Sequence, residues 1–500
     1  MNNINELRRR TPLMGWASWN CFRTNISEDI LKKQADLLVS TGLAFHGYTY
    51  FNVDDGFFGG RDENGRLQFH AKRFPNGIKV ISDYAHSKGL KAGIYTEAGD
   101  NTCGYYYDNE GMNGFHSGAY NHEESDLRQL LAENNFDFIK IDWCGGLRLG
   151  LDEETQYSKL ASIIRKIEQE ENRPIVFNVC RWEFPGTWVV KIADSWRTGA
   201  DIAPNFESVL YQIDQMKALR KFCSPGHVND SDMMQVGNGM SHEEDVTHFA
   251  MWCMLSTPLM LGCDLATLTD STLEIITNDE LIAINQDSLC NQAYVCKEYF
   301  DPDTKKLVGE VWVKDLSDGS RAVAILNRGD HDITVSSIFK AVGIEGKIHS
   351  IRNLIERKDE DLDDNSSISI PSHGIRVYKI AAEVMREMED VNSYKEYDET
   401  KINHMEKSEA IALAREGKVK LVDVRNVSEY EAGHYDSAVN IPYQEIYLHT
   451  EELLPDKDEK IVLYCATGKR AFITKRHLES RGYTNIAITD SYFGEKKYVK

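Results

Sequence analysis

The sequence has few of the features that mark secreted, membrane or metal-binding proteins. No apolar run in its 500 residues is long enough to cross a bilayer, and its first residues lack the apolar segment of a signal peptide. Its ten cysteines form no CxxC and no mixed Cys/His spacing suited to zinc, and they are too sparse for a disulfide scaffold. We therefore expect a cytoplasmic protein that uses no membrane, no metal and no cofactor.

Positive charge is also scarce. The chain has 57 Lys and Arg against 79 Asp and Glu, which gives a formal charge of -22. Such a surface repels phosphate backbones and anionic lipids, so nucleic acid is not an expected partner. The glycine fingerprint GxGxxG of dinucleotide-binding folds is absent as well. A neutral ligand such as a sugar suits this composition, whereas the oligomeric state is left open.

The chain is long enough for two or three domains, and its patterns change at three points. In residues 1–290, eight short apolar runs alternate with amphipathic stretches, which predicts a (β/α)₈ barrel, with an open doubly wound sheet as the alternative. Residues 291–383 contain short runs separated by polar turns, which is typical of an antiparallel β-sandwich domain. Residues 384–403 form a polar linker, and residues 404–500 a small α/β domain.

The predicted barrel strands end in polar, aromatic or sulfur-bearing side chains. These are Trp19-Asn20, Asp54-Asp55, Glu97, Asp142, Cys180, Asp201 and Asp232. Active sites of such barrels lie at the carboxyl ends of the strands. So many polar groups at that one position favour a catalytic site over a chance pattern.

Asp142 ends the run FIKIDWC. Because side chains alternate along a strand, Lys140 points the same way as Asp142, and a nearby ammonium favours the ionised carboxylate. An ionised carboxylate suits a nucleophile that attacks an anomeric carbon. The alternative is that Asp142 merely caps the next helix.

Asp201 ends the run WRTGAD and is the predicted general acid. A general acid must hold a proton near neutral pH, which burial or a neighbouring carboxylate favours. The alternative is the N-cap of a helix in IAPNFESVL. Asp54 and Asp55 are costly to bury unless they are hydrogen-bonded, and sugar hydroxyls are suitable partners, although a solvated Asp-Gly turn is the alternative.

Aromatic side chains near these strand ends offer flat faces on which a sugar stacks. They are Trp16, Trp19, Phe57, Trp143 and Trp182. For any one of them, ordinary core packing is the alternative.

Residues 8–290 resemble glycoside hydrolase family 27, the α-galactosidase and α-N-acetylgalactosaminidase family. The resemblance is carried by TPLMGWASWN, YFNVDDGF, RFPNGIKVISDYAHSKGLKAGIY, FIKIDWCGG, DSWRTGADI, VNDSDMMQVGN and LIAINQD. It implies an exo-acting, retaining hydrolase of α-galactosides with a covalent galactosyl-enzyme, Asp142 as nucleophile and Asp201 as acid/base. It also places around the sugar the side chains of Trp19, Asp54, Asp55, Tyr95, Lys140, Arg197 and Asp232.

The loop after the fifth predicted strand departs from the family pattern. Many α-galactosidases have Cys-Glu-Trp there, with the Glu on the sugar 2-hydroxyl, whereas this chain has Cys180-Arg181-Trp182-Glu183. Either Arg181 donates to O2 or Glu183 turns into the site, so an α-N-acetylgalactosaminide remains an alternative substrate. In the family's pattern the Asp54-Asp55 pair binds O4 and O6, so the resemblance favours galactose over L-arabinopyranose, which lacks the C6 hydroxymethyl group, and a β-L-arabinopyranoside is the other alternative substrate.

Cys103 and Cys144 fall where many family members have a disulfide between the loops after the third and fourth strands. The resemblance therefore implies a bond, whereas a reducing cytoplasm argues against it.

Cys465 ends the buried run IVLYC and is followed by Ala466, Thr467, Gly468, Lys469 and Arg470. A loop between a strand and a helix N-terminus gathers main-chain N–H groups, and the two cations add positive charge, which favours a thiolate. The alternative is a buried structural cysteine.

Residues 404–500 resemble a rhodanese-like domain through LVDVRNVSEYEAGHYDSAVNIPY and YCATGKRA. The resemblance implies a persulfide on Cys465 within a six-residue loop closed by Arg470, and a structural pair of Asp423 and Arg425. It predicts a sulfur donor or acceptor as a second partner, with a non-catalytic redox or interaction module as the alternative.

Overall fold

The computed structural model describes residues 8–303, 306–336, 338–388, 390, 403–466 and 468–489. The chain divides into two compact units, residues 1–394 and 395–500, and each is described by itself. Most of the predicted linker lies outside the described residues.

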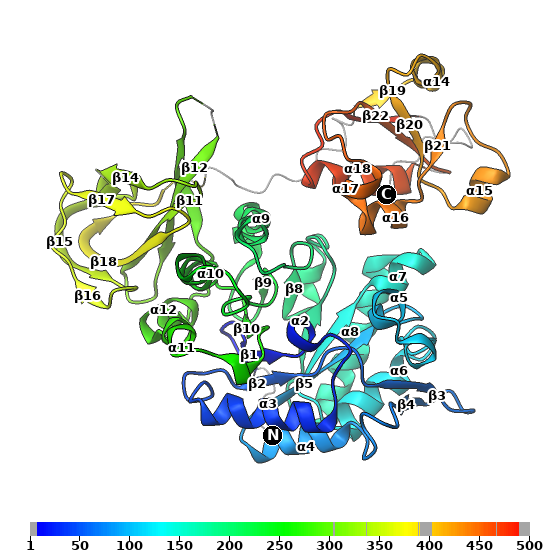
Figure 1. Ribbon diagram of the computed structural model, residues 1–500, viewed down its shortest axis with the longest axis horizontal. Coiled ribbons are helices and arrows are strands. Elements are labelled where there is room, and N and C mark those ends of the chain that lie inside the picture. Colours follow the sequence, from blue (N-terminus) through cyan, green and yellow to red (C-terminus); the bar gives the residue numbers. More distant parts are fainter. Residues whose placement is uncertain are drawn as a thin grey trace. The chain divides into compact units, whose positions relative to one another are not determined.

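Eight parallel strands form the first part of the larger unit (Figure 1). Their order around the sheet is β10-β1-β2-β5-β6-β7-β8-β9, and a bridge between Met234 and Leu261 joins its two ends. The predicted (β/α)₈ barrel is therefore confirmed, and the open sheet is wrong. The strands are β1 (Met14–Ala17), β2 (Tyr50–Asn52), β5 (Lys91–Glu97), β6 (Phe138–Asp142), β7 (Val176–Val179), β8 (Ser195–Arg197), β9 (Val228–Asp230) and β10 (Leu259–Leu261).

Helices follow the strands and surround them (Figure 1). Ser27 caps the first long helix, and its apolar stripe of Leu31, Ala35 and Leu38 is buried, as the 3.6-residue period requires. The helices are α2 (Trp19–Phe22), α3 (Glu28–Ser40), α4 (Lys79–Ser87), α5 (Cys103–Tyr107), α6 (Glu123–Leu127), α7 (Cys144–Leu149), α8 (Glu153–Glu171), α9 (Phe206–Met216), α10 (His242–Met254), α11 (Asp270–Ile276) and α12 (Asp279–Asn285). A short hairpin, β3 (Phe58–Arg61) and β4 (Leu67–Phe69), follows β2.

The remainder of the larger unit is an antiparallel β-sandwich, as predicted. Its six-stranded sheet has the order β11 (Tyr294–Phe300), β12 (Leu307–Asp315), β13 (Arg321–Asn327), β18 (Ile375–Met385), β15 (Ile344–Asn353) and β16 (Lys358–Asp359). A two-stranded sheet pairs β14 (Ile333–Ser336) with β17 (Ser367–Ile370), and α13 (Ile338–Ala341) lies between β14 and β15 in the chain.

A buried lysine joins the sandwich to the barrel. Lys314 on β12 donates to Ser256 Oγ at 2.7 Å and to the Cys253 carbonyl at 3.1 Å. Burial lowers the pKa of Lys314 to about 8. These bonds fasten the sandwich to the C-terminal end of α10.

The C-terminal unit is a five-stranded parallel sheet with helices, which confirms the predicted small α/β domain. Its strand order is β19 (His404–Met405), β23 (Ile486–Thr489), β22 (Ile461–Tyr464), β20 (Lys420–Asp423) and β21 (Val439–Asn440). The helices are α14 (Lys407–Arg415), α15 (Val427–Glu431), α16 (Tyr443–Leu448), α17 (Thr450–Leu453) and α18 (Lys469–Ser480).

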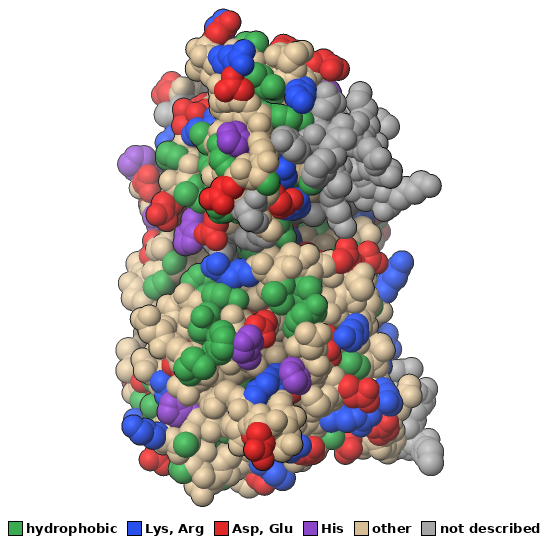
Figure 2. Space-filling model, turned by 90° about the vertical axis from the view of Figure 1, so that its right-hand side faces the viewer, with side chains coloured by type: hydrophobic (Ala, Val, Ile, Leu, Met, Phe, Trp, Pro, Cys, Tyr) green, Lys and Arg blue, Asp and Glu red, His purple; other side chains and the backbone are tan. Residues whose placement is uncertain are grey.

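Within the described ranges, no helix is both long and apolar enough to span a membrane. On the face drawn in Figure 2, blue and red side chains are interspersed, and the Lys and Arg residues do not gather into one basic patch.

Candidate active site

Asp142 is the last residue of β6, and its side chain is buried at the carboxyl end of the barrel. Lys140 Nζ lies 3.7 Å from Asp142 Oδ2 and 2.9 Å from Asp54 Oδ2. The Cys180 thiol, one residue beyond β7, also hydrogen-bonds to Asp142. The following helix α7 takes Trp143 as its N-cap residue and has no side-chain cap, so the helix-capping interpretation of Asp142 is wrong.

Burial and Lys140 act on Asp142 in opposite directions. Burial raises the pKa of Asp142 to about 6, while the Lys140 ammonium lowers it by a smaller amount. The expected influence of Lys140 is therefore present, but it does not dominate. Because the resulting pKa is below 7, Asp142 is mainly a carboxylate at neutral pH.

Asp201 differs from its prediction in two ways. It lies in the loop beyond β8, which ends at Arg197, and its side chain is 61% exposed. Helix α9 is capped by Asn205, so Asp201 is not the helix cap either. The chain itself does not supply the burial that an acid role requires.

Arg197 connects Asp201 to a second carboxylate. Its buried guanidinium lies 3.2 Å from Asp201 Oδ1 and 2.9 Å from Asp232 Oδ2. Asp232 Oδ2 also accepts from the Ile202 N–H at 2.8 Å, next in sequence to Asp201. Burial raises the pKa of Asp232 above its ordinary value, and Arg197 opposes that rise. This network fixes the loop that presents Asp201.

A cavity in the barrel interior lies between Lys140 and Arg197, and Asp142 and Asp201 are not among the residues that line it. Its charged lining comes from two parts of the barrel. Asp54 and Lys140 lie near the ends of β2 and β6, and Arg197 and Asp232 lie near the ends of β8 and β9. Apolar side chains complete the wall, among them Leu13, Ile94, Phe138 and Met260. The mixture of a few charged groups with apolar walls is typical of a small-molecule site.

Asp55 and Tyr95 fix the start of helix α5. The Asp55 carboxylate accepts from Gly56 N–H at 2.7 Å and from Gly104 N–H at 2.6 Å, and Tyr95 Oη accepts from Cys103 N–H at 3.2 Å. Asp55 is buried, so the solvated-turn interpretation is wrong, and burial raises its pKa to about 7. A sugar contact by either residue stays a prediction.

The aromatic candidates fall into two groups, one buried and one half-buried. Trp16, Phe57 and Trp143 are buried, so core packing describes them. Trp19 is half-buried against apolar residues of the barrel interior, and the Arg23 guanidinium lies 4.5 Å from its ring centre. Trp182 is also half-buried. A sugar contact by Trp19 or Trp182 stays a prediction.

Arg181 is paired within the protein. Its Nε lies 2.7 Å from a Glu153 carboxylate oxygen at the start of α8, and its guanidinium also contacts Glu183. Arg181 and Glu183 neutralise one another in the protein. That Arg181 donates to O2, or that Glu183 turns into the site, stays a prediction.

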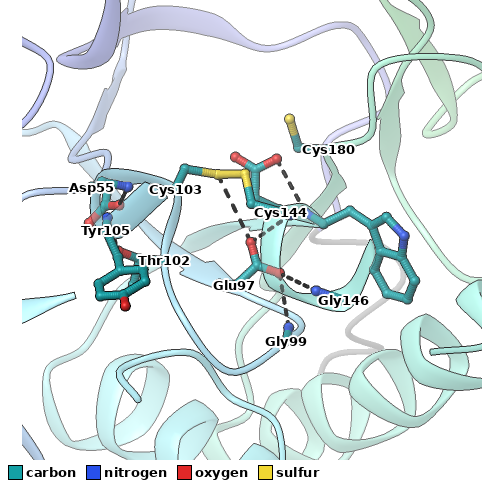
Figure 3. Close-up of a disulfide and its surroundings, with 12 residues drawn as sticks. Asp55, Glu97, Gly99, Thr102, Cys103, Tyr105, Cys144, Gly146 and Cys180 are labelled. Carbon is teal, nitrogen blue, oxygen red and sulfur yellow. Dashed lines mark hydrogen bonds between the residues drawn. A yellow bond between two sulfur atoms is a disulfide. The ribbon is translucent and has the colours of Figure 1, made fainter. Parts of the chain in front are cut away.

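Cys103 and Cys144 form a disulfide, with Cα atoms 5.6 Å apart (Figure 3). The bond joins the first residue of α5 to the first residue of α7, two positions after Asp142. Such bonds persist mainly in oxidising compartments, so the bond and the expected cytoplasmic location point in opposite directions. The location stays a prediction.

In the C-terminal unit, Cys465 follows β22 and its Sγ is buried beneath the start of α18. Sγ accepts from the Gly468 N–H at 3.1 Å and from the Ala471 N–H at 3.5 Å. Arg470 is held by Glu429 at 2.6 and 2.7 Å. Thr467 and the side chain of Lys469 lie outside the described residues. The loop therefore presents main-chain donors to the sulfur.

Asp423 and Arg425 form the expected structural pair of this unit. Both are buried, and Arg425 donates to Asp423 at 2.6–3.0 Å and to the Gly433 carbonyl at 2.7 Å.

Three parts of the chain match protein-family models. Residues 11–287 match the family described as Alpha galactosidase A, and residues 309–380 match the Alpha galactosidase C-terminal beta sandwich domain. Residues 406–491 match the Rhodanese-like domain.

Curated relatives and solved structures agree with these matches. The chain is 35% identical over 404 residues to Alpha-galactosidase A of Cellvibrio japonicus, which covers 75% of this chain and 93% of that protein. It is 37% identical over 375 residues to an Alpha-galactosidase of Cyamopsis tetragonoloba, covering 74% and 86%. The crystal structure of alpha-galactosidase I from Mortierella vinacea superposes with a TM-score of 0.66 at 28% identity, over 75% of this chain and 98% of that one. The chain therefore belongs to glycoside hydrolase family 27, the α-galactosidase family, and carries a rhodanese-like domain at its C-terminal end.

Proposed function

We propose that the barrel hydrolyses terminal α-D-galactosides with retention, using Asp142 as nucleophile and Asp201 as acid/base. The observation that carries the proposal is the position of Asp142, which is buried at the end of β6 between Lys140 and Cys180. The relatives named α-galactosidases support the substrate class.

The reaction takes two steps, and in each step the proton that one group loses is taken up by another. In the first, an Asp142 oxygen attacks the anomeric carbon, the glycosidic C–O bond breaks, and Asp201 gives its proton to the departing oxygen. In the second, Asp201 takes a proton from water, the water oxygen attacks the anomeric carbon, and Asp142 leaves as a carboxylate.

The remaining polar groups bind and orient the sugar. Lys140 Nζ and Asp54 Oδ2, 2.9 Å apart, offer a donor and an acceptor to vicinal hydroxyls such as O3 and O4 or to O6. Arg197 holds Asp201 and Asp232 in one network, so the acid is carried by a loop with a defined position. Asp55 and Tyr95 support this site through α5.

We expect nitrophenyl α-galactoside to be the preferred substrate in a panel with nitrophenyl α-N-acetylgalactosaminide and nitrophenyl β-L-arabinopyranoside. The Arg181, Glu153 and Glu183 cluster fills the loop after β7 with large side chains, which disfavours an acetamido group. Asp54, which pairs with Lys140, favours a sugar that has a C6 hydroxyl. The measurement is kcat/KM for each glycoside at equal pH. A higher value for either of the other two glycosides would replace α-galactosidase by that activity.

We further propose that Cys465 carries a sulfane sulfur. The Cys465 thiolate would attack the outer sulfur of thiosulfate, the S–S bond would break, and sulfite would leave, so that a persulfide remains on Cys465. The N–H groups of Gly468 and Ala471, which already point at Sγ, support this role because they stabilise negative charge on sulfur.

Cyanide should release thiocyanate from the full-length protein after it is loaded with thiosulfate or polysulfide. Cys465→Ala should release none, because the acceptor sulfur is gone, while its α-galactoside turnover should equal that of the wild type. The measurement is thiocyanate per protein, in parallel with glycosidase activity. If the loaded wild type releases no thiocyanate, the domain is instead a non-catalytic redox or interaction module.

A further inference from the structure

Glu97 is a buried carboxyl group next to the proposed nucleophile. It is the last residue of β5, none of its surface is exposed, and it stands opposite Asp142 in the pairing of β5 with β6. The sequence pattern predicts that Glu97 ends a strand, but it predicts no role for the side chain. The mechanism above does not use it.

The partners of Glu97 are main-chain N–H groups from two separate connections. Oε1 accepts from Gly99 at 2.9 Å and from Gly146 at 3.2 Å, and Oε2 accepts from Cys144 at 2.9 Å. Figure 3 shows these bonds below the disulfide, whose Cys103 sulfur lies 4.0 Å from Oε2. One carboxyl group therefore connects the loop after β5 to the start of α7.

The loop after β5 and the start of α7 touch at Gly99 and Gly145. A Cβ added to Gly99 would lie 2.1 Å from the carbonyl carbon of Gly145, so only glycine allows the backbones to come this close. The approach brings the N–H groups of Gly99 and Gly146 onto the same oxygen. A carboxyl group accepts hydrogen bonds on both of its oxygens, and both keep acceptor capacity when the group is protonated.

We propose that Glu97 is a positioning residue for the glycosidase reaction, which holds the main chain just after Asp142 in the geometry of nucleophilic attack. The inference rests on the proposed function of Asp142. The segment from Asp142 to Gly146 is held on one side by the Cys103–Cys144 bond and on the other by the two N–H···O bonds from Cys144 and Gly146 to Glu97. The anchored positions are Cys144 and Gly146, and only Trp143 separates Cys144 from Asp142, so a shift at Cys144 is passed directly to Asp142.

The electrostatic surroundings agree with this geometry. Burial, together with ionised Asp142 on the neighbouring strand, raises the pKa of Glu97 to about 8, and the main-chain N–H groups of Gly99 and Gly146 oppose that rise. Glu97 in turn raises the pKa of the phenols of Tyr95, Tyr106 and Tyr157, for each of which burial is the larger cause. Because the resulting pKa is above 7, Glu97 is mainly protonated at neutral pH, and its two oxygens still accept from the N–H groups of Gly99, Gly146 and Cys144.

The test is Glu97→Gln in the full-length protein. Glutamine keeps one acceptor oxygen and replaces the other by an NH₂ group, which cannot accept a hydrogen bond. Either the bond from Cys144 N–H or the two bonds from Gly99 and Gly146 N–H are therefore lost. We expect kcat on nitrophenyl α-galactoside to fall about 100-fold while KM stays within about twofold, because the nucleophile is displaced and the sugar contacts are not. Glu97→Asp, which keeps two acceptor oxygens, should recover part of the loss.

Glu168→Gln is the matched control. Glu168 is also a buried carboxylate that accepts a main-chain N–H, from Ile175 at 2.7 Å, but Ile175 precedes β7 and lies at the opposite end of the strands. Its replacement should lower the melting temperature and leave kcat near that of the wild type. The inference is overturned if Glu97→Gln loses no more kcat than Glu168→Gln, or if its loss appears in KM alone. A wild-type protein without turnover would overturn the proposed function and this inference with it, whereas normal turnover in both wild type and Glu97→Gln would overturn the inference only.

Discussion

Replacing Asp142 with alanine should reduce the turnover of nitrophenyl α-galactoside by about 10⁴-fold or more, because alanine has no oxygen that can attack the anomeric carbon. Asp142 is buried, and Lys140 and Cys180 both orient its carboxylate. Azide should restore part of the activity, since a small anion fits the space that the carboxylate leaves. The product of that rescue should be the β-galactosyl azide, which reports attack from the face that Asp142 normally occupies.

Asp137→Asn is the control for this prediction. Asp137 is also buried, but it precedes β6 and accepts from the Ala92 N–H and from His86 at the other end of the strand. We expect it to retain activity in the fraction that folds. Substantial activity of Asp142→Ala without azide would contradict the assignment.

The kcat/KM of the wild type should decline below a pH of about 6, because burial raises the pKa of Asp142 to that value and the protonated form is not a nucleophile.

Replacing Asp201 with alanine should produce a loss that depends on the leaving group. For substrates whose leaving oxygen is a sugar or an alkyl alcohol, we expect kcat/KM to fall about 10²- to 10⁴-fold, because proton donation to that oxygen is lost. For dinitrophenyl α-galactoside the loss should be much smaller, since the dinitrophenolate leaves without a proton. The quantity to compare is kcat/KM, because it reports the first chemical step even when hydrolysis of the galactosyl-enzyme limits kcat.

Glu207→Gln is the control for Asp201. Glu207 is an exposed acid in the first turn of α9, a few residues along the chain from Asp201, and nothing in the site depends on it. Its activity should equal that of the wild type with every leaving group. A uniform loss of kcat/KM in Asp201→Ala across the series would show that Asp201 supports the site without donating a proton.

The strand ends of the barrel were well predicted because they depend on local patterns. The alternation in FIKID puts Lys140 and Asp142 on one face, and the structure has them 3.7 Å apart. Asp201 was less well predicted, because WRTGAD continues past the strand into a loop and no short-range pattern distinguishes the two. The role assigned to Arg181 depended on the loop after β7, where the cluster with Glu153 and Glu183 involves a helix whose position no local pattern supplies.

The sequence by itself determined the barrel, the sandwich, the small α/β domain and the carboxylates at the strand ends, since hydrophobic periods and turn residues act over a few positions. Only the tertiary structure decided which polar groups meet. Burial raises the pKa of Asp142 more than Lys140 lowers it, Arg197 ties the exposed Asp201 to Asp232, and Glu97 holds the chain after the nucleophile. These effects depend on distance and solvent exposure between residues far apart in the chain, and those quantities exist only once the strands have closed into a barrel.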